Sequence, residues 1–367
     1  MAGPIRVMVV DDSAFMRTAV ARTLSSDERI VVVAQARDGR DAVEQAAKLQ
    51  PDVITMDFNM PRMNGAEAVR AILAERPIPV VMLSAHTLDG AKETLEALAA
   101  GAVDFLTKPD GEVSTDLSGI RAELIRKIIG ASKARPQAAP ALRSDAPPTP
   151  ISARATPSAG LIPPSATEPA SERISFASMV LDPIVVIAIS TGGPAALEHV
   201  IPRLPADFPR GVLVVQHMPA QFTGALAERL NGVSPLSVRE ARPSERLAAG
   251  TVLVAPGDRH VVFERSGMIR LTDALPVNGC RPSADVTLQS AAPVYGNRIT
   301  VVVMTGMGRD GALGAAAVRS AGGRVLAQDR DSSVVYGMPR AVVEMGITDE
   351  VLPLSRIASR LERISRS

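Results

Sequence analysis

Short apolar runs alternate with amphipathic stretches along two separate parts of the chain. Apolar runs of four to six residues predict buried strands, and positions with a period of 3.6 residues predict helices. In the first part, strands and helices are expected in turn at residues 5–10, 14–24, 30–34, 39–49, 53–56, 64–75, 80–83, 89–100 and 104–106. Strict alternation of strand and helix is typical of a doubly wound parallel sheet.

The alternation returns after residue 183 and predicts a second α/β domain. Strands are expected at 184–189, 212–215, 252–255, 299–304 and 324–327, and helices at 220–230 and 311–321. Between the two parts, residues 131–177 are rich in proline, alanine and serine, a composition that favours a flexible, partly extended linker. We therefore predict domains at 4–125 and 180–367, joined by this linker.

Composition narrows the class of protein. A length of 367 residues fits about two domains. The net charge of +1 and the aromatic content of 2% give no reason to expect nucleic acid as a partner. The N-terminus lacks a signal-peptide layout, and no apolar run is long enough to span a membrane. The single cysteine, Cys280, is expected to be a buried core residue, with a nucleophile as the alternative. A reducing cytoplasm is the expected compartment.

Polar residues follow four of the first five predicted strands. They are Asp11 with Asp12, Asp57, Ser84 and Lys108. Functional groups gather at the carboxyl ends of parallel strands, and clustered carboxylates are suited to Mg²⁺. Mg²⁺ and Lys108 would neutralise a phosphoryl group on Asp57, and the Ser84 hydroxyl would donate a hydrogen bond to it. Alternatively, Asp11 and Asp12 only cap the following helix.

The segments VDDS (10–13), MDFNMPRMNG (56–65), LSA (83–85) and DFLTKP (104–109) resemble the response-regulator receiver family. The resemblance implies a flavodoxin-like fold, Mg²⁺ held by the aspartates at 11, 12 and 57, and phosphorylation of Asp57 by a histidine kinase. Phe105 occupies the position of the family's aromatic switch residue, although plain core packing explains it equally well.

A second set of polar residues follows strands of the second part. Ser190 ends the run 184–189 and precedes two glycines, so its hydroxyl is expected to be exposed. Among the four histidines, His86, His199, His217 and His260, only His217 directly follows a predicted strand outside the first domain. A serine nucleophile needs such a base. A phosphate-binding loop at 190–193 and a purely structural His217 are the alternatives.

The turn after the strand 299–304 supplies the third group. Asp310 would orient His217 and stabilise its charged form, whereas the alternative is a simple helix N-cap. Backbone N–H groups of this glycine-rich turn could form an oxyanion hole, with Met307 the best candidate.

The segments ISTGGPAAL (189–197), QHMP (216–219), APGDRH (255–260), CRPSADV (280–286), MTGMGRDG (304–311) and AQDRDSSVVYGMPRAVVE (327–344) resemble the chemotaxis protein-glutamate methylesterase family. The resemblance implies a Rossmann-like catalytic domain with Ser190 as nucleophile, His217 as general base and Asp310 as orienting acid. It implies that methyl-accepting chemoreceptors are the substrates, that γ-glutamyl methyl esters release methanol, and that receptor glutamines can be deamidated. No cofactor is expected for the esterase. The family more often has glycine at position 188, where this chain has Ala188.

Two other points follow from the sequence. The loops 280–286 and 332–340 could line a substrate groove, or could simply pack. The rival functions are a DNA-binding output domain, against which the second part lacks a basic patch and a compact helix-turn-helix, and a nucleotide-binding domain. Nucleotide binding predicts sensitivity at Gly192 and tolerance at His217 and Asp310, whereas a hydrolase predicts the reverse.

Overall fold

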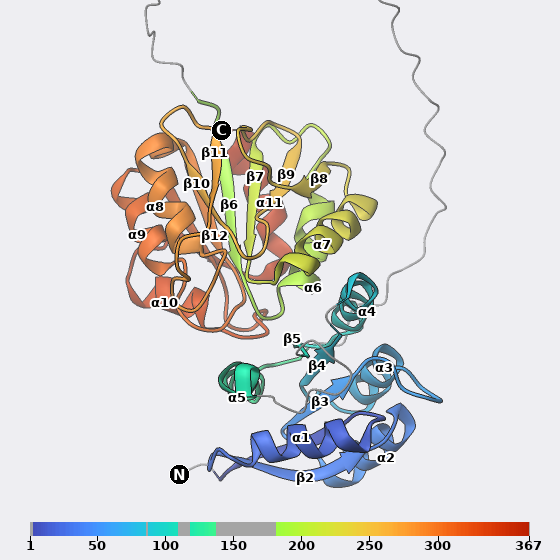
Figure 1. Cartoon of the computed structure of the whole chain (residues 1–367). Helices are drawn as coiled ribbons and strands as arrows, with labels where there is room; N and C mark the ends of the chain where they lie inside the picture. Colours follow the sequence, from blue (N-terminus) through green and yellow to red (C-terminus); the bar gives the residue numbers. More distant parts are fainter. Residues whose placement is uncertain (1–2, 86, 109–117, 137–180, 367) are drawn as a thin grey trace, which may run out of the picture. The chain divides into compact units, whose positions relative to one another are not determined.

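The computed structural model describes residues 3–85, 87–108, 118–136 and 181–366 (Figure 1). Most of the predicted linker, together with His86 and Pro109, lies outside these residues. The first domain carries one sheet, and the second carries a larger sheet and a short hairpin. In the described residues, no helix combines the length and the apolar character needed to cross a membrane.

The first domain is a five-stranded parallel sheet with helices on both faces. Its strands lie in the order β2-β1-β3-β4-β5. The elements are β1 (Ile5–Val10), α1 (Ala14–Leu24), β2 (Ile30–Ala36), α2 (Gly39–Leu49), β3 (Val53–Asp57), α3 (Gly65–Glu75), β4 (Val80–Ser84), α4 (Leu88–Ala99), β5 (Asp104–Thr107) and α5 (Ser118–Ala131).

Alternate residues of its strands enter two different cores. Val7 and Val9 of β1 pack with α1 and α5, whereas Met8 and Val10 pack with α2 and α3. Side-chain caps begin α1 to α4, and in α3 Asn64 and Glu67 form a reciprocal capping box. The predicted strands and helices of this domain are therefore confirmed, while α5, which extends past residue 125, was not predicted.

The second domain is a seven-stranded parallel sheet in the order β14-β13-β12-β6-β7-β9-β8, with the antiparallel hairpin β10-β11 beside it. Its strands are β6 (Ile184–Ile189), β7 (Gly211–Gln216), β8 (Ser237–Glu240), β9 (Thr251–Val254), β10 (His260–Phe263), β11 (Ile269–Thr272), β12 (Ile299–Val303), β13 (Arg324–Gln328) and β14 (Glu350–Leu352). Its α-helices are α6 (Gly193–Val200), α7 (Ala220–Val233), α8 (Ala284–Tyr295), α9 (Ala312–Ser320), α10 (Met338–Glu344) and α11 (Leu354–Arg366). Short 3₁₀ turns occupy Ile201–Arg203 and Gly296–Arg298.

The helices of this domain form a layer on each side of its sheet (Figure 1). One layer contains α6, α7 and α11, and it covers Val185, Ile187 and Ile189 of β6. The other contains α8, α9 and α10. The chain leaves β6 toward the first layer and leaves β12 toward the second. A crevice at the carboxyl ends of these two neighbouring strands is the usual site of function in such sheets.

Candidate functional sites

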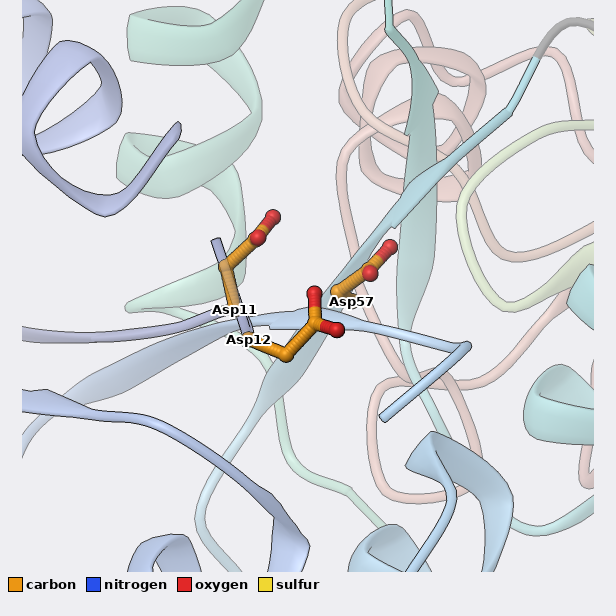
Figure 2. Close-up of side chains that lie close together, drawn as sticks. All are labelled: Asp11, Asp12 and Asp57. Atoms are coloured by element: carbon orange, nitrogen blue, oxygen red, sulfur yellow. The ribbon is translucent and has the colours of Figure 1, made fainter. Parts of the chain in front are cut away.

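The first candidate site is an acidic cluster at the carboxyl ends of β1 and β3. Asp11 and Asp12 follow β1, Asp57 ends β3, and each offers a carboxylate oxygen within 4.8 Å of the others (Figure 2). Lys108 Nζ lies 2.8 Å from both Asp11 Oδ2 and Asp57 Oδ1. The structure therefore brings together the three aspartates and the lysine that the sequence indicated.

The electrostatics of this cluster favour added positive charge. Burial raises the pKa of Asp57 to about 6 against the opposing effect of Lys108, and the nearby charge of Asp11 adds to the rise. Hard carboxylate oxygens converging at this spacing suit Mg²⁺. The cluster is consistent with a Mg²⁺ site.

Ser84 is the last residue of β4, and Phe105 lies in β5. The Ser84 hydroxyl donates to Gly90 O at 3.0 Å and accepts from Thr94 Oγ1 at 2.5 Å, so α4 holds it in this structure. Phe105 is buried, and Lys127 Nζ lies 5.6 Å from its ring centroid. Support of a phosphoryl group by Ser84 therefore requires its hydroxyl to turn away from α4.

The second candidate site is centred on a contact between a histidine that follows β7 and an aspartate in the turn after β12. His217 directly follows β7, and its Nε2 lies 2.7 Å from Asp310 Oδ2. Since Nε2 donates to the carboxylate, Nδ1 is the ring nitrogen available to a nucleophile. The predicted meeting of His217 and Asp310 is confirmed.

Asp310 is held by the N-terminus of α8. Its Oδ1 accepts from Ser283 Oγ at 2.6 Å and from Asp285 N at 3.2 Å, and its Oδ2 accepts from Ala284 N at 2.6 Å. Burial raises the pKa of Asp310, but His217 and these donors outweigh burial and bring it down to about 2. The carboxylate is therefore ionised and fixed in orientation.

For residues 283–285 the sequence leaves two alternatives, a groove lining or simple packing. Packing holds for these three, because all are at most 2% exposed. Ser283 is the N-cap of α8, and Asp285 accepts from Gly314 N of α9 at 2.7 Å. Asp310 thus accepts from the first N–H groups of α8, and Asp285 of α8 accepts from an N–H group of α9. These bonds connect the two helices. The serine before a helical stretch was the signal available in the sequence.

Cys280 occupies the other side of the histidine ring. Its Sγ lies 3.4 Å from His217 Nδ1 and its side chain is half-buried, so the expected buried core role is wrong. Burial lowers the pKa of His217, but the hydrogen bonds and charges of Asp310 and Cys280 outweigh burial and raise it to about 9. The upward effect of Asp310 agrees in direction with the sequence-based expectation, which did not include a contribution from Cys280.

Ser190 lies next to His217 through the pairing of their strands. Its backbone N–H donates to Thr305 O at 3.0 Å, while His217 N donates to Ile189 O at 3.1 Å. In the described part of the chain, Ser190 Oγ has no hydrogen bond to His217, whose Nδ1 faces Cys280 instead. The Ala188 methyl is fully buried near Gly311. The strand therefore accommodates alanine at this position.

Met307 lies in the turn that leads from β12 to Asp310. Its backbone N–H donates to no other group among the described residues, so it can bind a substrate oxygen. His260 is buried, accepting from Ser283 N at 3.1 Å, with its Nε2 3.2 Å from Leu275 O. This histidine has a structural role behind Asp310, whereas His199 lies in α6.

Comparisons with known proteins agree on both domains. Residues 7–114 match the response regulator receiver domain, and residues 185–361 match the CheB methylesterase family. A protein-glutamate methylesterase/protein-glutamine glutaminase of Symbiobacterium thermophilum is 49% identical over 360 residues, covering 98% of this chain and 97% of that protein. A protein of the same description from Archaeoglobus fulgidus is 44% identical, with coverage of 98% and 97%.

A third relative, from Thermotoga maritima, is 42% identical and has the same description, with 97% of each chain covered. The similarity in all three extends over both domains rather than over one of them. The chain therefore belongs to the CheB family of protein-glutamate methylesterases/protein-glutamine glutaminases, with a response-regulator receiver domain at its N-terminal side.

Proposed function

We propose that the chain hydrolyses glutamate γ-methyl esters of methyl-accepting chemoreceptors, and that phosphorylation of Asp57 regulates this activity during chemotactic adaptation. The proposed catalytic residues are Ser190 as nucleophile, His217 as general base and Asp310 as orienting acid. The observation that carries the proposal is the 2.7 Å contact between His217 Nε2 and a deeply held Asp310, which leaves Nδ1 directed away from the carboxylate.

In the first half of the reaction, Ser190 Oγ attacks the ester carbonyl carbon while His217 Nδ1 removes the hydroxyl proton of Ser190. This requires Nδ1 to exchange its contact with Cys280 for one with Ser190. The developing oxyanion accepts a hydrogen bond from Met307 N–H, and Asp310 stabilises the imidazolium. The tetrahedral intermediate collapses, His217 returns the proton to the leaving methoxide, and methanol departs from an acyl-enzyme.

In the second half, His217 deprotonates a water molecule that attacks the acyl-enzyme. Collapse releases the glutamate carboxylate and regenerates the Ser190 hydroxyl with the proton from His217. A glutamine side chain can follow the same course with ammonia as the leaving group. Deamidation of receptor glutamines is therefore a second activity of the same residues, and neither reaction requires a cofactor.

Methanol release from methylated receptor membranes tests the esterase assignment. Ser190→Ala should reduce kcat by several orders of magnitude, because members of a catalytic triad act as one unit. Combining Ser190→Ala with His217→Ala should cost little more than either change alone. A folded Ser190→Ala protein that releases methanol at a near-normal rate would overturn the mechanism.

The proposed regulation starts at the receiver. A histidine kinase would supply the phosphoryl group to Asp57, with Lys108 and Ser84 contacting its oxygens. Mg²⁺, held by Asp11, Asp12 and Asp57, would neutralise the phosphoryl charge during this transfer. The raised pKa of Asp57, which burial causes, supports a site built to accept a cation.

We also propose that the unphosphorylated receiver restrains the esterase by covering its site. A linker of about 47 residues has a mean end-to-end distance of roughly 35–40 Å if flexible, so it would permit docking and release. It would keep the receiver at about millimolar effective concentration, at which a weak interface suffices. A loss of docking affinity of about 1.4 kcal/mol on phosphorylation would shift the equilibrium tenfold.

Truncation tests this regulation. A fragment that begins near residue 174 should release methanol faster than the unphosphorylated whole chain, and a small phosphodonor should not change its rate. If the fragment is slower at saturating substrate, the receiver activates the esterase instead of restraining it.

A further inference from the structure

A buried glutamine connects the main chains of the proposed nucleophile and base. Gln216 is the last residue of β7 and is paired in register with Ile189 of β6. Its Nε2 donates to Ser190 O and to His217 O, both at 3.1 Å. The side chain is 2% exposed. One amide nitrogen therefore contacts both residues that must exchange a proton.

The orientation of this amide is determined by its surroundings. Both groups facing Nε2 are carbonyl oxygens, so a flipped amide would place oxygen against oxygen twice. Gln216 Oε1 is buried and has no hydrogen-bond partner among the described residues. A buried carbonyl without a partner is unfavourable. The two bonds from Nε2 are thus made even though the other end of the amide is left unsatisfied.

The second glycine of the turn after Ser190 makes room for this side chain. A Cβ built on Gly193 would lie 1.9 Å from Gln216 Oε1 and 2.9 Å from its Cδ. Any side chain at position 193 would displace the amide. The glycine is therefore explained by the close approach of Gln216, while the N–H of Gly193 donates to Ser190 O at 2.8 Å.

We propose that Gln216 is a positioning residue for the esterase reaction, in which its Nε2 fixes the spacing between Ser190 and His217. The proposal rests on the catalytic roles proposed above. Gln216 touches neither substrate nor the reacting atoms, and it acts only through the two main chains that it joins. Proton transfer from Ser190 to His217 depends steeply on their separation, and a misplacement of about 1 Å can cost about a hundredfold in rate.

Gln216→Met tests the proposal in the whole chain, since methionine has a similar length and lacks the two donors. With methylated receptor membranes as substrate, we expect kcat to fall by about a hundredfold and KM to change less than about twofold. Gln216→Glu should be no more active than Gln216→Met, because a carboxylate would face both carbonyl oxygens.

Thr287→Val provides a matched control. Thr287 is fully buried in α8 and its Oγ1 donates to Val261 O at 2.8 Å, so the change also removes a buried donor from a main-chain carbonyl. We expect it to lower the melting temperature without lowering kcat. If Gln216→Met has wild-type kcat, or if Thr287→Val lowers kcat equally at equal loss of stability, the positioning role is wrong.

Amide hydrogen exchange supplies a readout independent of activity. Gln216→Met should accelerate exchange in the peptides containing residues 189–194 and 216–218, with protection unchanged in the rest of the sheet. Unchanged exchange in these peptides would contradict the proposal. The two proposals fail in different ways. If the proposed function is wrong, Ser190→Ala keeps its activity. The exchange measurement does not depend on activity and still tests the role of Gln216.

Discussion

The pKa of a buried aspartate is raised in the first domain and lowered in the second. Burial raises the pKa of Asp57 to about 6, whereas hydrogen-bond donors around Asp310 overcome burial and lower its pKa to about 2. Asp57 has Lys108 as a neighbour but also the negative charge of Asp11. Asp310 accepts hydrogen bonds from His217, Ser283 and Ala284.

The difference shows that burial alone does not decide the state of a carboxylate. Asp57 lies in an acidic cluster whose negative charge Lys108 only partly balances. Binding of a cation, or a phosphoryl group on Asp57, would therefore change the charge balance of this cluster strongly. Asp310 is surrounded by fixed donors and has little left to gain. This fits the proposed roles: Asp57 as a residue that is modified, and Asp310 as a carboxylate that stays ionised through each turnover.

The largest expected effect is at Asp57. Asp57→Asn should abolish incorporation of phosphate from a small phosphodonor, because the amide is not a phosphoryl acceptor. The measurement is labelling with and without Mg²⁺, and removal of Mg²⁺ from the unchanged protein should also prevent it. Labelled Asp57→Asn protein would show that another residue accepts the phosphoryl group.

Asp310→Asn should reduce kcat by about 10⁴, as loss of the orienting carboxylate does in serine hydrolases with a comparable triad. His217, Ser283 and Ala284 donate to the two carboxylate oxygens of Asp310, and the asparagine amide would offer them only one acceptor oxygen. The rate of methanol release gives the measurement. Phosphorylation of Asp57 in this variant is the control and should be normal. A loss below tenfold would mean that Asp310 mainly caps α8.

Ser283→Ala should have a smaller effect, about a tenfold loss in kcat, which corresponds to about 1.4 kcal/mol. The change removes the 2.6 Å bond to Asp310 but leaves the two backbone donors in place. Ser290→Ala is the matched control, because this serine of α8 contacts Phe263 N and Thr287 O instead. Equal losses in both variants would point to general destabilisation of α8.

The smallest effect is expected at Cys280, as a displacement of the pH profile. Cys280 raises the pKa of His217 to about 9 together with Asp310, so Cys280→Ala should lower that pKa. Since the base must be neutral, the rise of kcat/KM with pH should move to lower pH. Profiles of both proteins from about pH 6 to 10 give the comparison. An unchanged midpoint would show that Asp310 alone sets the pKa of His217.

Much of the fold follows from the sequence because buried parallel strands are continuous apolar runs. The strand β6 and the helices α1 and α2 have the predicted bounds. Short edge strands such as β8 lack such runs. The helix α8 was not predicted, because its first residues were assigned to a loop although Ser283 marks its N-cap. The helix α11 could have been found, since its buried Ile357, Ala358, Leu361 and Ile364 have helical spacing.

The proposed catalytic residues were predictable for a related reason. Ser190, His217 and Asp310 follow the carboxyl ends of three neighbouring strands, so their proximity results from sheet topology. Cys280 and Gln216 were not predictable as part of the site. Their contacts depend on the path of a loop and on the orientation of one buried amide, and no local pattern specifies either.

The place of Cys280 makes this chain convenient for labelling. It is the only cysteine in the sequence, and its sulfur lies beside the ring of His217. A thiol-specific fluorophore or spin label would therefore attach at a single position, without the removal of other cysteines by mutagenesis. The rate of that attachment, followed against pH, would report the ionisation of the neighbouring imidazole in the unmodified protein.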